Sequence, residues 1–107
     1  MAARVQILPA DAKIGDVLEV RLIIGHPMES GLRRDDVGAR IQRNIVNKVT
    51  CKYNGVEVFN AELGPGIAAN PYLTFHTRAT RSGELQFDWV DDAGERGSER
   101  VVLNLKT

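Results

Sequence analysis

The pair Asn54-Gly55 constrains the fold of this chain more than any other feature of its sequence. Residues with high strand propensity lie on both sides of it, at positions 49–53 and 56–63. Asn-Gly is the preferred pair for the two-residue turn of an antiparallel hairpin, because that turn needs positive φ at both positions. Residues 49–63 are therefore predicted to form a β-hairpin in which Tyr53 pairs with Val56.

The predicted hairpin has apolar residues on both of its faces. A regular register places Cys51 on one face, which suits the inside of a sheet, and pairs Thr50 with Phe59 on the other. Phe59, Ala61 and Leu63 continue along that second face, where solvent would favour polar residues. A small monomer has no need of two apolar faces, so the second one indicates a contact with a partner. A β-bulge in either strand would exchange the faces.

Alternation of apolar and polar residues predicts further strands on both sides of the hairpin. The clearest of them end at Ile24 and at Trp89, and Trp89 is expected to anchor the core. With the hairpin, which begins near Ile45, this gives about seven strands: 3–8, 17–24, 45–53, 56–63, 72–79, 84–89 and 101–105. No segment has the period of a helix. The chain is therefore predicted to be all-β, an immunoglobulin-like antiparallel β-sandwich forming one domain over residues 1–107.

The charge balance and the apolar content exclude two classes of protein. Fourteen basic and fourteen acidic residues cancel, and no cluster of Lys and Arg alternates with aromatic residues, so the sequence lacks the pattern of a nucleic-acid-binding protein. Its apolar runs are too short to cross a bilayer, and the first residues lack the apolar core of a secretory signal. By themselves these features predict a cytoplasmic protein.

Cys51 is the single cysteine, so neither an internal disulfide nor a Cys-x-x-Cys redox pair can form. Cys51 and His76 would make the simplest nucleophilic pair. Alternation argues against it, because Cys51 lies on the predicted inner face and His76 on the outer face of its strand. His26 and His76 have no third metal ligand at a suggestive spacing, while Asp91 and Asp92 are typical of a charged turn. The residues predict no catalytic site, no metal and no cofactor.

Residues 25–43 form the longest segment without strand character. Turn formers and charged residues fill it, from His26-Pro27 to Gly38. Loops of this length in a compact domain are often functional, and the alternative is a mobile connector. The segment is therefore a candidate for a partner contact.

Several short motifs together resemble one family. They follow one another along nearly the whole chain in this order: His26-Pro27-Met28-Glu29-Ser30-Gly31, Tyr53-Asn54-Gly55, Val58-Phe59, Ala61-Glu62-Leu63, Ala68-Ala69-Asn70-Pro71-Tyr72, and Trp89 with Asp91-Asp92. The set resembles the SoxZ family, whose members form one half of the SoxYZ sulfur carrier of bacterial thiosulfate oxidation.

The resemblance implies an immunoglobulin-like sandwich that forms a heterodimer with SoxY. In that family the sulfur substrate is carried on a cysteine in a glycine-rich carboxy-terminal arm of SoxY, and the final residues of this chain contain neither cysteine nor glycine. The implied role is a non-catalytic scaffold on which pathway enzymes dock. The implied location is the periplasm, reached by export together with SoxY, which carries the twin-arginine signal.

Two groups of residues are predicted to contact partners. The hairpin residues predicted to face SoxY are Phe59, Ala61 and Leu63. The loop residues predicted to face the SoxY arm or a visiting enzyme are His26, Met28, Arg33 and Arg34. Two other classes of function stay open: a thiol enzyme or direct sulfur carrier that uses Cys51, and a free-standing binding sandwich.

Overall fold

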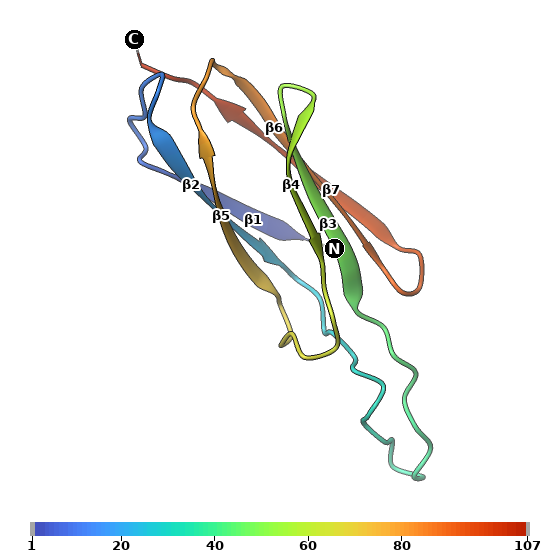
Figure 1. Ribbon diagram of the computed structural model, residues 1–107. Coiled ribbons are helices and arrows are strands. Elements are labelled where there is room, and N and C mark those ends of the chain that lie inside the picture. The colour runs from blue at the N-terminus through green and yellow to red at the C-terminus, as the bar shows by residue number, and fades with distance from the viewer. Residues whose placement is uncertain (1, 107) are drawn as a thin grey trace.

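The computed structural model describes residues 2–106 and places seven strands in two antiparallel sheets (Figure 1). In chain order the strands are β1 (Ala3–Leu8), β2 (Val17–Ile24), β3 (Val46–Tyr53), β4 (Val56–Glu62), β5 (Tyr72–Arg78), β6 (Gly83–Asp91) and β7 (Arg96–Leu103). One sheet has the order β1-β2-β5 and the other β4-β3-β6-β7. The predicted all-β sandwich is confirmed. Within the described residues there is no helix that could span a membrane.

The core lies between the two sheets and is built from alternate residues of β2, β3 and β6. The predicted inward sets are confirmed, because all of them are buried: Leu18, Val20, Leu22 and Ile24 in β2, and Leu85, Phe87 and Trp89 in β6. Strand alternation explains this result, since residues two apart point to the same side of a sheet. Gly97 pairs with Trp89 in the neighbouring strand, and a Cβ there would come within 2.3 Å of the indole.

The hairpin of β3 and β4 has the predicted turn but not the predicted register. Asn54 and Gly55 both have positive φ, at 48° and 85°, and Tyr53 pairs with Val56. Farther from the turn there is a bulge, because Lys52 pairs with Glu57 while Cys51, the residue before it, pairs with Phe59. The predicted pairing of Thr50 with Phe59 is therefore wrong.

The bulge turns Phe59 toward the interior. Its ring stacks on that of Phe75 in β5, with 4.3 Å between the centroids and 9° between the planes. Leu63 is also half-buried against the core, and the outward positions of the same strand hold exposed Asn60 and Glu62. One extra residue has exchanged the two faces beyond it. The second apolar face predicted for this hairpin does not exist.

The last strand also differs from the prediction, because β7 begins at Arg96 rather than at Val101 and ends at Leu103. Its first half has few apolar residues, and it lies at the edge of its sheet, where side chains meet solvent more often than in a central strand. Apolar alternation was therefore too weak a signal there. Val101 and Leu103 do face the core as predicted.

The segment between β2 and β3 extends away from both sheets as two legs joined by a turn (Figure 1). This protruding loop, residues 26–44, contributes to the elongated shape of the molecule, which measures 61 × 21 × 19 Å.

Candidate functional site

The protruding loop is an irregular hairpin. Its legs are joined near the base by reciprocal backbone hydrogen bonds between Glu29 and Asn44, each 2.9 Å long. Near the far end Arg34 lies opposite Arg40, and Asp35 Oδ1 accepts two backbone N–H groups of the closing turn at 3.0 Å. These bonds give the loop a definite shape without regular strands.

Two apolar side chains of the loop are more exposed than any other large hydrophobic residue among positions 2–106. Leu32 is 77% and Val37 is 88% exposed. Arg33 forms an ion pair with Glu29, and Arg34 Nη1 lies 2.9 Å from the carbonyl oxygen of Gly38. Exposed apolar groups surrounded by polar ones are typical of a surface that binds another protein. This end of the loop is the best candidate for a partner contact.

His26 anchors the first leg of the loop. Its side chain is 3% exposed, and Nε2 lies 3.1 Å from Asp91 Oδ2. The backbone N–H of Met28 donates to His26 Nδ1 at 2.9 Å, so Nδ1 carries no proton. Nε2 must then be the protonated nitrogen, and it donates to Asp91. His26 is therefore a neutral imidazole held between two partners.

Burial opposes ionisation of Asp91, but hydrogen bonds from His26 and from the backbone N–H of Glu95 outweigh it, so the pKa of Asp91 lies below its usual value. Met28 is buried beside this pair, with φ of 54°, and its Sδ accepts a hydrogen bond from the Val46 N–H at 3.2 Å. His26 and Met28 were predicted to contact a partner. Both side chains are buried and anchor the first leg of the loop, and their contact with a partner stays a prediction.

Asp92 anchors the second leg. Its carboxylate accepts hydrogen bonds from Arg43 Nε at 2.7 Å, from Asn47 Nδ2 at 2.9 Å and from the backbone N–H of Ile45 at 3.2 Å. The bond from Arg43, followed by that from Asn47, holds the pKa of Asp92 well below its usual range. Asp91 and Asp92 thus hold one leg each. Sequence reasoning identified them only as a charged turn, because their partners lie 65 and 49 residues away along the chain.

The predicted partner residues do not form one surface. Arg33 and Arg34 are exposed on the loop, His26 and Met28 are buried at its base, and Phe59, Ala61 and Leu63 lie on or just after β4. The contact of each group with a partner stays a prediction. For Phe59 the argument from a second apolar face no longer applies, because its ring faces the interior.

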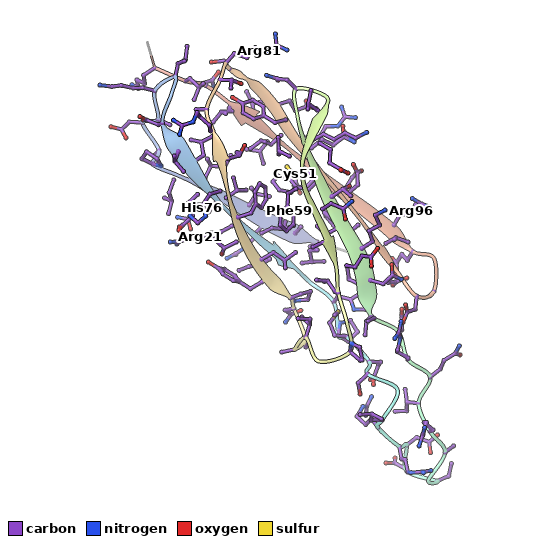
Figure 2. The ribbon with its side chains drawn as sticks, viewed as in Figure 1. Arg21, Cys51, Phe59, His76, Arg81 and Arg96 are labelled. Atoms are coloured by element: carbon purple, nitrogen blue, oxygen red, sulfur yellow. The ribbon has the colours of Figure 1, made fainter. Side chains whose placement is uncertain are left out.

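Cys51 and His76 are not brought together. Figure 2 shows Cys51 between the sheets and His76 on the outer side of β5, close to Arg21. Burial, with a smaller effect of the Asp88 charge, raises the pKa of the Cys51 thiol to about 12. His76 Nε2 instead lies 3.4 Å from Glu19 Oε1. Over residues 2–106 no three His, Cys, Asp or Glu side chains are grouped so that they could hold a metal ion.

Solved structures with the same fold include superoxide reductases, also called neelaredoxins. The protein from Ignicoccus hospitalis is 18% identical, with a TM-score of 0.72 over 99% of this chain and 81% of its own. A putative superoxide reductase from Thermotoga maritima is 12% identical, with a TM-score of 0.71 over 98% and 86%. A variant of the neelaredoxin from Archaeoglobus fulgidus, in its reduced form, is 17% identical, with a TM-score of 0.66 over 98% and 89%. At such low identity the likeness shows the fold alone.

A search of curated proteins found no match. A family model described as "Sulphur oxidation protein SoxZ" matches residues 5–102. The matched range includes the protruding loop, the bulged hairpin and the Asp91-Asp92 pair. With nearly the whole chain matched, this protein belongs to the SoxZ family of sulphur oxidation proteins.

Proposed function

We propose that this chain is the non-catalytic subunit of a heterodimeric sulfur carrier and serves as the scaffold for SoxY. Membership of the SoxZ family makes the chain a component of the Sox sulfur-oxidation system. The finer role, in which a cysteine in the arm of SoxY holds the substrate during thiosulfate oxidation, is the proposal. We also propose that the pair works in the periplasm after export on the signal of SoxY.

The burial and the raised pKa of Cys51 are the main support for this proposal, because a direct sulfur carrier would need a reactive thiol and a scaffold would not. The thiol is buried between the sheets and its pKa is raised to about 12. Burial therefore suppresses the thiolate at neutral pH, and the thiolate is the form that attacks sulfur. A residue in this environment supports packing and argues against sulfur transfer.

The binding surface for SoxY is proposed to lie on the outer side of the three-stranded sheet. Ile23 and Tyr72 are register partners there and are 38% and 55% exposed. With Arg21 they line a shallow hollow next to β1. A stable interface buries roughly 800 Å² on each partner, and we propose that a sheet face contributes to it together with the loop tip. The loop tip with Leu32 and Val37 is proposed to receive the SoxY arm or a visiting enzyme.

Mixing the purified chain with SoxY is expected to give one species with the mass of a heterodimer. Light scattering after size-exclusion chromatography measures this mass directly. Tyr72→Asp should weaken association at least about tenfold, because it places a charge in the apolar contact. Ser98→Asp, on the outer side of β7, is the matched control and should bind normally. A chain that stays monomeric beside SoxY would exclude the scaffold role.

Loading the complex with thiosulfate is expected to leave Cys51 unmodified. Intact-mass and peptide mass spectrometry should locate the sulfur adduct on SoxY, and Cys51→Ala should load to within about twofold of the natural chain, because the buried thiol takes no part in the chemistry. The control is SoxY with its arm cysteine replaced, which should not load. An adduct on Cys51 would instead support the direct carrier.

A further inference from the structure

We infer that Asp91 and Asp92 form a two-sided clamp that sets the direction of the protruding loop and keeps it ordered before a partner arrives. The clamp is a property of this chain alone. Its consequence for docking rests on the function proposed above.

The far part of the loop has no attachment of its own to the sandwich. All hydrogen bonds described for residues 30–42 join them to other residues of the loop, such as that from the Ile41 N–H to the Arg33 carbonyl oxygen at 2.8 Å. Its internal bonds can keep its shape, but they cannot fix its direction relative to the sheets. The direction is therefore set where the two legs enter the sandwich.

The first leg is attached at His26 on two sides. Asp91 accepts the hydrogen bond from the imidazole, and Asn70, in the connector before β5, exchanges two hydrogen bonds with the backbone of His26 at 2.7 and 3.1 Å. Asp91 is itself held where β6 enters the β6–β7 turn. Its N–H donates to the Glu95 carbonyl oxygen at 3.0 Å, and its Oδ1 accepts the Glu95 N–H at 2.9 Å. The first leg is thus joined to the hydrogen-bonded turn between β6 and β7.

The second leg is attached to the same turn. Arg43 and the Ile45 N–H donate to the Asp92 carboxylate, as described above. In addition, the Ile45 carbonyl oxygen accepts the Asp92 N–H at 2.9 Å, and Asn44 Oδ1 accepts the Ala93 N–H at 3.2 Å. Asp91 is the last residue of β6 and Asp92 the first residue of the turn after it, and the two neighbouring carboxylates reach one leg each. A single turn thereby controls both legs.

The two carboxylates differ in how deeply they are buried. The Asp91 side chain is 1% exposed and belongs to the core, whereas that of Asp92 is 19% exposed and Arg43 opposite it is 49% exposed. Removing the Asp92 carboxylate should partly release the second leg, which keeps its bonds to the N–H groups of Asp92 and Ala93, without opening the core. An ordered loop loses less conformational entropy on binding than a mobile one, so this release should weaken docking although Asp92 itself need not touch the partner.

The direction of the loop can be measured with two spin labels on the full chain without SoxY. Val37→Cys labels the loop end and Ser98→Cys the outer side of β7, both exposed, while natural Cys51 is buried and does not react. Double electron–electron resonance gives the distribution of distances between the labels. We expect a narrow distribution for the labelled chain and one at least about twice as wide after Asp92→Ala. Trp89 fluorescence shows that the sandwich is still folded.

Asp88→Ala is the matched control, because Asp88 lies in β6 shortly before Asp92 and, within residues 2–106, its side chain accepts hydrogen bonds only from Gln86. It should leave the distribution narrow. Arg43→Ala removes the clamp from the other side and should widen the distribution even if Asp92→Ala fails to fold. A distribution that stays narrow in both clamp variants, or that widens equally in the control, would overturn the clamp. Failure to bind SoxY would leave this result unchanged and would count against the proposed function instead.

Discussion

Replacing Phe59 by aspartate is expected to destabilise the fold strongly, and not merely to remove a partner contact. The Phe59 ring stacks on that of Phe75, and the ring centroid of Phe75 lies 6.4 Å from that of buried Phe87. Phe59 therefore closes the core where β4 faces β5. Losing the ring and placing a carboxylate against apolar neighbours should cost about 3–5 kcal/mol. That is a large part of the roughly 5–15 kcal/mol by which domains are stable. Urea unfolding followed by Trp89 fluorescence measures the loss.

Asn60→Asp is the control for this variant, because Asn60 is the next residue of β4 and is exposed. Its stability should stay within about 0.5 kcal/mol of the natural chain. If the Phe59 variant kept its stability yet lost SoxY, the original assignment of Phe59 to the interface would be right and the inward packing would be irrelevant to it.

Asp91→Ala is expected to cost roughly 2–4 kcal/mol at pH 7, because it leaves the His26 Nε2–H and the Glu95 N–H without acceptors in a buried site. The cost should depend on pH. The folded-state pKa of Asp91 is lowered, so its carboxylate contributes fully above the ordinary carboxyl pKa, near 4, and less as the pH falls through the lowered folded value. Unfolding measured from pH 7 to pH 2 should show the gap between the variant and the natural chain narrowing in acid.

Asp88→Ala, on the outer side of the same strand, again provides the control. Its cost at pH 7 should be below about 1 kcal/mol, because a partly exposed side-chain hydrogen bond is worth little. A gap for Asp91→Ala that stayed constant down to pH 2 would mean that the ionised carboxylate does not hold His26.

Local patterns were sufficient wherever one residue type dictates the backbone or one period is unbroken. Asn54-Gly55 predicted its turn because few other pairs adopt positive φ twice. The alternation in β2 and β6 predicted which side chains are buried, since it runs through the length of each strand. In the first half of β7, where the apolar alternation is weak, the strand was missed.

The candidate site depended on pairs that are distant in sequence. His26 and Asp91 were each visible as polar residues, but no spacing rule connects positions 65 residues apart. Their burial could not be predicted either, because a histidine or aspartate is buried only when a partner is present to satisfy it. The exposure of Leu32 and Val37 could not be predicted from the sequence either, since apolar residues in a loop are often covered by the body of the protein.

The hairpin shows most clearly what each level determined. The sequence by itself determined the turn, the strands and the sandwich, because these depend on backbone preferences and on the period of two. Only the tertiary structure decided that the register shifts between Cys51 and Lys52, that Phe59 turns inward onto Phe75, and that Asp91 and Asp92 each hold one leg of the protruding loop. The physical reason is the same for all three. Each is settled by contacts between segments that come together only when the two sheets pack, and such contacts leave no period or motif in the chain.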